Sequence, residues 1–268
     1  MKPKFSLVYL TTGSKSPAEM IDIAAQAEYD CIDARVIPMG LPGEQTFDIS
    51  RDRRLFLDTK YAMERTGVTF ESIENATVND GKDVGRYEPI LAAAAELGVK
   101  RVLSNIWAKD RSFAIDQFGK LCRIAAQYGQ SIDLEFVTWA EVRDLREAEE
   151  FLGEVGCGNA GIVVDSLHFH RSRVEWTELA EMPEELAYCL HVCDAPEGFP
   201  TAAEELAYTA REARLYPGEG VVDIRRMAGM KNWAVYGIEI PNARMWDDKG
   251  FRRHAEEALA RTKAFLKM

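Results

Sequence analysis

Short runs of β-branched and aromatic residues alternate with longer amphipathic stretches along almost the whole chain. The short runs have the length and composition of buried strands, and the longer stretches repeat their apolar residues at helical spacing. The predicted strands cover residues 5–10, 31–37, 68–73, 100–106, 131–137, 161–165, 188–192 and 234–240. Two predicted helices begin at Ser16 and at Thr138. The other predicted helices cover residues 51–65, 87–97, 113–128, 176–180, 201–211, 222–230 and 251–266.

Local signals support several of these helix starts. Ser16 is followed by Pro17 and, three residues on, by Glu19, which is the pattern of a capping box with proline in the first turn. Thr138 and Glu141 have the same spacing. Eight strand–helix alternations without a Pro- or Ser-rich linker predict one α/β domain over residues 1–268, a (β/α)8 TIM barrel rather than an open doubly wound sheet. No G-x-G-x-x-G follows the first strand, which disfavours dinucleotide binding.

Charged residues inside the predicted strands locate the candidate chemistry. Side chains alternate between the two faces of a strand, so a charged residue with apolar neighbours on both sides should point into the barrel. This test selects Glu135, His191 and Glu239, and Asp165 ends its own apolar strand. All four lie near the C-terminal ends of strands five to eight, where barrel enzymes carry their active sites.

The negative charges of three carboxylates that lie beside one imidazole in a low-dielectric interior must be neutralised by a positive charge. For any one of these residues a buried ion pair would suffice, but the four together favour a bound divalent cation. The oxygen-rich donor set Glu135, Asp165, His191 and Glu239 favours Mn2+ or Mg2+, and Co2+ or Zn2+ is also compatible.

Further polar residues should surround this centre. Arg35 passes the alternation test and could contact a ligand or pair with Asp33, while Glu74 and Asn105 could bind hydroxyl groups or cap loops. His168 is close enough to Asp165 to overhang the site. The other candidates for substrate contact lie in loops on the same face, namely Arg171, Arg173, Arg211 and Arg214, whereas His170 and His254 are expected at the surface.

Composition narrows the range of partners. The 268 residues include 33 basic and 44 acidic side chains, a net charge of -11, which disfavours a nucleic-acid partner. The five cysteines contain no C-x-x-C pair, and there is neither a signal-peptide core nor an apolar run of membrane-spanning length. We therefore expect a cytoplasmic protein with a small-molecule, carbohydrate-like substrate and no membrane partner; association into a homo-oligomer is compatible with the sequence.

Several segments together resemble the xylose isomerase-like TIM barrel superfamily, in its sugar phosphate isomerase and epimerase branch. They are Val164-Asp165-Ser166-Leu167-His168, His191-Val192-Cys193-Asp194, Arg214-Leu215-Tyr216-Pro217-Gly218-Glu219-Gly220 with Asp223, and Gly237-Ile238-Glu239. The resemblance implies that Glu135, Asp165, His191 and Glu239 bind one divalent metal ion. It also implies that Glu135 and Glu239 act as acid and base, with His168 and Arg214 assisting at the substrate.

The resemblance predicts a metal-dependent isomerase or epimerase that acts on a sugar, sugar phosphate or cyclic polyol ketone through an enediolate. Two residues depart from common patterns of the family: Cys193 stands where many relatives have lysine, and Val137 where dehydratase-like members have histidine. A dehydroshikimate dehydratase-like enzyme and a catalytically inactive carbohydrate-binding barrel remain alternatives. A DNA-repair endonuclease of this fold would need a multinuclear metal cluster and a basic groove, which the four histidines and the negative charge disfavour.

Overall fold

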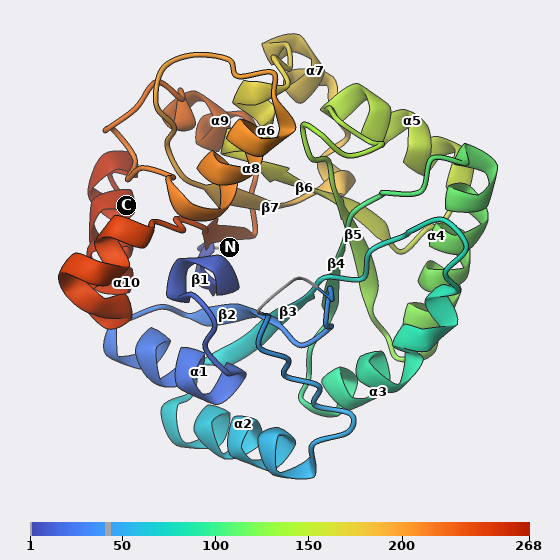
Figure 1. Ribbon diagram of the computed structural model, residues 1–268, viewed down its shortest axis with the longest axis horizontal. Helices are drawn as coiled ribbons and strands as arrows, with labels where there is room; N and C mark the ends of the chain where they lie inside the picture. The colour runs from blue at the N-terminus through green and yellow to red at the C-terminus, as the bar shows by residue number, and fades with distance from the viewer. Residues whose placement is uncertain (1, 41–43) are drawn as a thin grey trace.

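A computed structural model describes residues 2–40 and 44–268 and contains a closed barrel of eight parallel strands. Each strand pairs with its neighbours in chain order, and β1 closes the ring against β8, with Ser6 opposite Gly237. Figure 1 shows the ring of strands surrounded by a ring of helices. The predicted TIM barrel is therefore confirmed.

The strands agree with the predicted runs to within a few residues. They are β1 (Lys4–Val8), β2 (Cys31–Arg35), β3 (Thr69–Glu74), β4 (Arg101–Ser104), β5 (Ser131–Glu135), β6 (Ala160–Asp165), β7 (Ala187–Val192) and β8 (Val235–Ile238).

The helices are α1 (Pro17–Gln26), α2 (Arg53–Thr66), α3 (Glu88–Glu96), α4 (Arg111–Gln127), α5 (Leu145–Val155), α6 (Ser166–Arg171), α7 (Trp176–Glu181), α8 (Ala203–Glu212), α9 (Ile224–Met230) and α10 (Ala243–Leu266). Short 3-10 helices are η1 (Tyr9–Thr12), η2 (Val84–Tyr87) and η3 (Glu184–Leu186). No helix in these described ranges is both long enough and apolar enough to cross a membrane.

The helix starts test the capping predictions. Ser16 and Glu19 form the predicted capping box at α1. The start predicted at Thr138 is wrong, because α5 begins after Asp144, whose side chain accepts a hydrogen bond from the backbone N–H of Glu147. The residues after β5 form a turn instead, in which the N–H of Val137 donates to the carbonyl of Val142 at 3.0 Å. A carboxylate cap nine residues beyond the end of β5 leaves a loop long enough to border the barrel mouth.

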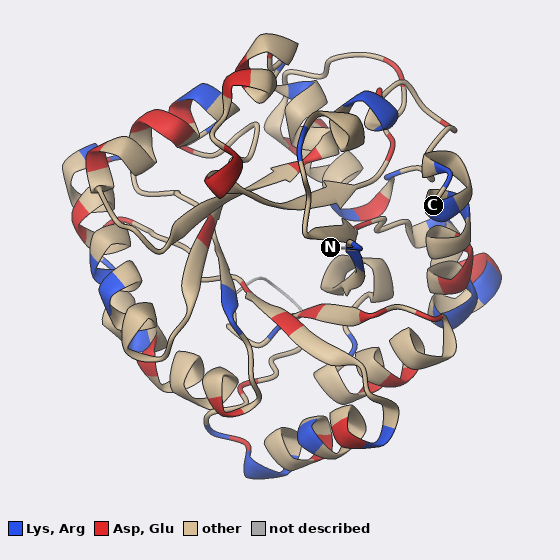
Figure 2. Cartoon of the chain, turned by 180° about the vertical axis from the view of Figure 1, so that it is seen from behind, with Lys and Arg blue, Asp and Glu red and all other residues tan. Residues whose placement is uncertain are grey.

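Most of the apolar core lies between the strands and the helices. Phe118, Phe136 and Phe151 belong to this outer layer. A smaller apolar cluster contains Leu103, Val163, Cys189 and Val235. The outward faces of the helices carry acidic and basic side chains interspersed around the ring (Figure 2), which agrees with the absence of segregated charge in the sequence.

Candidate metal centre

The four predicted metal ligands come together at the C-terminal mouth of the barrel. Glu135 and Asp165 end β5 and β6, His191 lies in β7, and Glu239 follows β8. One ligand atom from each of these residues lies within 4.8 Å of all the others. The Nδ1 atom of His191 is 3.2 Å from Oε2 of Glu239 and 3.5 Å from Oε1 of Glu135. The exposed fractions of Glu135, Asp165, His191 and Glu239 are 7%, 0%, 3% and 5%.

Arg214 supplies a positive charge in direct contact with this cluster. Its Nη1 atom is 2.5 Å from Oδ2 of Asp165 and 3.1 Å from Oε2 of Glu239. Burial would raise the pKa of Glu239, but Arg214 and His191 outweigh burial and hold that pKa well below its usual range. Burial dominates at Asp165 and raises its pKa even though Arg214 opposes the shift.

The charges of the cluster fit a divalent cation. Three ionised carboxylates and one guanidinium leave two negative charges, with His191 neutral as a ligand must be. Asn105 further constrains the cluster, since its side-chain N–H donates at 3.0 Å to Oε2 of Glu135 and at 3.0 Å to the carbonyl of the same residue. Oxygen donors with one imidazole suit the hard and borderline divalent ions.

Asp165 also serves as the N-cap of α6, a short helix that the sequence analysis did not predict. Its Oδ1 atom accepts hydrogen bonds from the N–H groups of Leu167 at 2.7 Å and His168 at 3.1 Å. The other carboxylate oxygen of Asp165, Oδ2, is left to contact Arg214 or a metal ion. The same cap sets the position of His168, so a candidate ligand and a candidate catalytic residue are joined by one turn of helix.

His168 is buried beside the centre. Its Nδ1 atom lies 3.2 Å from the hydroxyl of Thr138, and its ring packs edge-on against Trp139 with centroids 5.3 Å apart. Burial lowers the pKa of His168, which favours the neutral imidazole. Neutral His168 can therefore exchange hydrogen bonds with a hydroxyl or carbonyl group in the site.

A cavity of about 170 Å³ opens beside the four candidate ligands. The predicted residues that line it are Arg35, Glu74, Asn105, Glu135, His168, Arg211, Arg214 and Glu239. Arg35 does not pair with Asp33, because its Nη2 atom donates to Oε2 of Glu74 at 2.7 Å. One oxygen of that pair, Oε1 of Glu74, is buried without a hydrogen-bond partner.

Arg171 lies outside this cavity. Its guanidinium donates hydrogen bonds to the carbonyl groups of Pro196 and Gly198 and so ties α6 to the loop after β7. His254 is fully buried rather than exposed, because Tyr216 and the carbonyl of Ile240 bind its two ring nitrogens at 2.8 and 2.7 Å.

Sequence reasoning missed the apolar walls of the cavity, Leu10, Met39 and Trp139. These residues lie in loops or 3-10 turns, where no periodic pattern reports the direction of a side chain.

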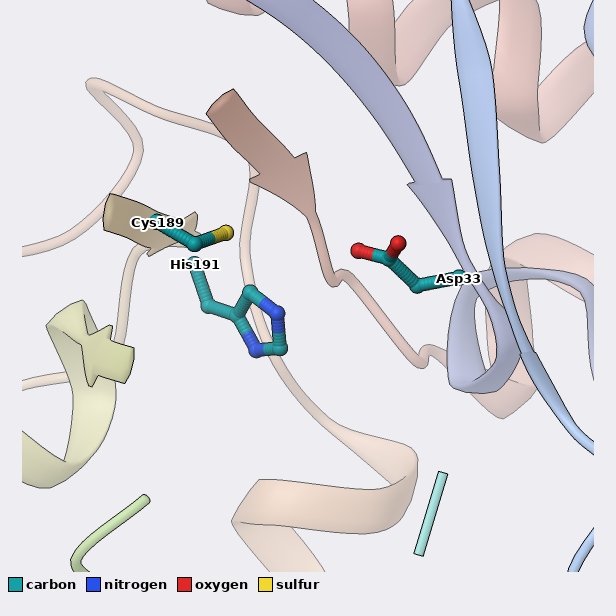
Figure 3. Close-up of side chains that lie close together, drawn as sticks. All are labelled: Asp33, Cys189 and His191. Carbon is teal, nitrogen blue, oxygen red and sulfur yellow. The ribbon is translucent and has the colours of Figure 1, made fainter. Parts of the chain in front are cut away.

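A second group of potential donors lies on the far side of His191, deeper in the barrel. Asp33, Cys189 and His191 each place a donor atom within 4.8 Å of the others, and Figure 3 shows the carboxylate of Asp33 facing the imidazole ring. Burial and nearby carboxylates raise the pKa of Asp33 to about 8, although His191 opposes the shift, and its Oδ1 atom has no hydrogen-bond partner. The adjacent cavity of about 20 Å³ has room for roughly one water molecule.

Comparison with known proteins agrees with this architecture. Residues 21–267 match the family model described as xylose isomerase-like TIM barrel. Inosose isomerase of Bacillus velezensis is 27% identical over 151 residues, which cover 53% of this chain and 52% of that protein. Inosose isomerase of Bacillus subtilis is 24% identical over 191 residues, 67% of this chain and 66% of that protein. The matches thus span about half to two thirds of these relatives.

Among solved structures, the IOLI protein with a bound zinc atom superposes on this chain with a TM-score of 0.81 at 18% identity, over 98% of each chain. At that identity the likeness establishes the fold.

Proposed function

The chain belongs to the xylose isomerase-like TIM barrel family, and from this premise we propose that it is a divalent-metal-dependent isomerase or epimerase of a sugar, sugar phosphate or cyclic polyol ketone. The observation that carries the proposal is the convergence of Glu135, Asp165, His191 and Glu239 within 4.8 Å beside a cavity lined by polar groups. The names of the inosose isomerase relatives support a cyclic polyol ketone such as an inosose as the first substrate to test.

Glu135, Asp165, His191 and Glu239 would hold the metal ion, for which Mn2+ or Mg2+ best suits the donors and Zn2+ or Co2+ is compatible. Such an ion supplies Lewis acidity that polarises a substrate carbonyl and acidifies the neighbouring C–H bond.

Glu135 and Glu239 carry the proton transfers in this proposal. They come from β5 and from the end of β8, so their carboxylates approach the cavity from different directions. One carboxylate removes the proton next to the carbonyl, and the other returns a proton to the enediolate. A positioned acid or base contributes roughly a hundredfold to ten-thousandfold to the rate.

The remaining polar groups orient the substrate. Neutral His168 and the amide of Asn105 can bind hydroxyl oxygens, and the Arg35–Glu74 pair offers a donor and an acceptor on the opposite wall. Arg214 holds Asp165 and Glu239 in place and offers its remaining N–H groups to substrate oxygens. Val137 lines the cavity with an apolar side chain, so it cannot serve as the second acid or base of a dehydratase.

Deuterium exchange tests this proposal. The protein loaded with Mn2+, Mg2+, Co2+ or Zn2+ is incubated in D2O with an inosose, with simple ketoses and with ketose phosphates, and exchange at the carbon next to the carbonyl is followed by NMR. We expect exchange, which Glu239→Gln should slow by at least about a hundredfold. Glu257→Gln on α10 removes the same charge from outside the cavity and should leave the rate unchanged.

Two results would contradict the proposal. Full activity of folded Glu239→Gln would remove Glu239 from the mechanism. Absence of exchange with every metal and every ketone or ketose phosphate tested would reject the isomerase function and favour a carbohydrate-binding barrel without activity.

The redox state of the cysteines supports a proposal for the cellular compartment. All five are free thiols, and four are buried. This supports a reducing compartment, and we propose the cytoplasm.

A further inference from the structure

A second cavity, of about 460 Å³, adjoins the candidate active site. The two cavities share Met39, Trp107 and Arg211 and are therefore direct neighbours. The first cavity, at about 170 Å³, is smaller than the roughly 300–1,000 Å³ of ordinary ligand pockets. It therefore suits the reacting part of a substrate, and the second cavity offers room for another part.

The second cavity is positively charged. Lys82, Arg86 and Arg211 line it, and no Asp or Glu among the described residues does so. Two carboxylates lie near the cavity without lining it: Asp83 pairs with Lys120, and Glu44 accepts hydrogen bonds from the backbone N–H groups of Met39 and Gly40. Three basic side chains that line one cavity create a local potential that attracts anions, although the net charge of the chain is -11.

Arg86 is held in position before any ligand arrives. Its Nη2 atom donates to the hydroxyl of Tyr87 at 2.5 Å, and its guanidinium lies 4.6 Å from the centre of the same ring. The Tyr87 hydroxyl in turn donates to the carbonyl of Thr77 at 2.8 Å. These contacts use one edge of the guanidinium and leave other N–H groups free, so the entropy lost on binding an anion is reduced.

Two of the four arginines that the sequence analysis names as candidates for substrate contact are engaged elsewhere. Arg171 donates to backbone carbonyl groups, and Arg214 contacts Asp165 and Glu239. Neither lines the second cavity. Lys82, Arg86 and Arg211 are therefore the cations available for a charged part of the substrate.

We infer that the second cavity binds a phosphate group of the substrate while the sugar or polyol ketone occupies the first cavity. This inference rests on the proposed function and narrows its substrate class to phosphorylated compounds. Guanidinium and ammonium groups donate charge-assisted hydrogen bonds to phosphate oxygens, and three cations match a dianionic phosphate better than a single carboxylate.

Binding of inorganic phosphate to the full chain tests the inference without any turnover. The protein is stripped of metal by a chelator, shown by circular dichroism to remain folded, and titrated with inorganic phosphate by calorimetry. We expect saturable binding of one phosphate per chain. Arg86→Ala, Arg211→Ala and Lys82→Ala should each weaken it by about tenfold or more, because each removes a charged hydrogen-bond donor.

Matched controls remove the same charges elsewhere. Lys60 on α2 and Arg123 on α4 are exposed and line neither cavity, so Lys60→Ala and Arg123→Ala should bind phosphate like the unmodified protein. Lack of saturable binding would overturn the inference, and so would equal losses in the control variants. Acetate binding as tight as phosphate binding would overturn the assignment to phosphate.

A second measurement separates this inference from the proposed function. With metal-loaded protein, a ketose phosphate should have a KM at least about tenfold lower than the matching ketose, and Arg86→Ala should remove that advantage with little change in kcat. Turnover of a ketose without phosphate binding would reject the inference alone. Phosphate binding without proton exchange on any substrate would reject the isomerase and leave the anion site standing.

Discussion

The substitution Gly237→Ala should weaken metal binding at the candidate centre although it replaces none of the candidate ligands. Gly237 lies in β8 directly opposite His191 of β7. A Cβ atom at this position would stand 2.5 Å from Cδ2 of His191, 3.0 Å from its Nε2 and 3.1 Å from Cγ2 of Val8. Carbon atoms in contact are about 3.5–4.0 Å apart, so the imidazole would have to retreat by about 1 Å.

The expected loss of metal affinity follows from the narrow range of ligand distances that a metal site tolerates. Ligand distances tolerate deviations of about 0.2 Å, and changes that disturb ligand orientation cost roughly 10–100-fold in metal affinity. We expect a loss in this range for Gly237→Ala. If part of the strain goes into Val8 and the strands instead, the free energy of unfolding should fall by about 1–3 kcal/mol.

Equilibrium dialysis against Mn2+ measures the affinity, and urea unfolding of metal-free protein measures the stability. Gly153→Ala is the matched control, because Gly153 lies within α5 and a Cβ there meets no atom within 4 Å. That variant should keep its metal affinity and gain about 0.5–1 kcal/mol of stability. If Gly237→Ala matches the unmodified protein in both measurements, His191 does not lie against β8 and the geometry of the centre is refuted.

Three further predictions concern stability. Burial lowers the pKa of His254 below 6.5, so the unfolded chain binds more protons than the native protein in acid. The free energy of unfolding should therefore fall as the pH drops below about 6.5, by up to about 1.4 kcal/mol per pH unit. In urea titrations between pH 7 and 5, the variant His254→Gln should show a smaller dependence of stability on pH. Asp133→Ala leaves Arg101, whose side chain is 17% exposed, without its bidentate partner at 2.5 and 2.7 Å; chemical unfolding should report a loss of about 1–3 kcal/mol, whereas an unchanged stability would contradict the pair. Removal of the metal by a chelator should lower the melting temperature by roughly 5–10 °C relative to protein with metal at a hundred times its dissociation constant, and an unchanged melting temperature would argue against a metal site.

The strand pattern predicted the barrel and the candidate ligands because both depend on local periodicity. Leu134 and Phe136 face the helices, which forces Glu135 to the inside, and the same holds for Glu239 between two isoleucines. Convergence of the four side chains then follows from the shared direction of parallel strands.

Hydrophobic periodicity does not predict the contacts that loop residues make. The sequence placed Arg214 in a loop on the correct face, but only the folded segment after α8 carries its guanidinium into a fully buried position against Asp165. The sequence analysis predicts His254 at the surface, but its ring is buried and contacts the carbonyl of Ile240, fourteen residues away along the chain. Helix α6 was missed because its N-cap, Asp165, is also the last residue of a strand.

The candidate donors to the metal all come from β5–β8, whereas Lys82 and Arg86 follow β3 and approach the cavity from the other half of the barrel. Arg211 on α8 belongs to the same half as the candidate metal donors, so the segment after β3 supplies two of the three cations and no candidate donor to the metal. Exchange of the segment between β3 and α3 for that of another family member would then change the lining of the second cavity and leave the candidate metal donors in place.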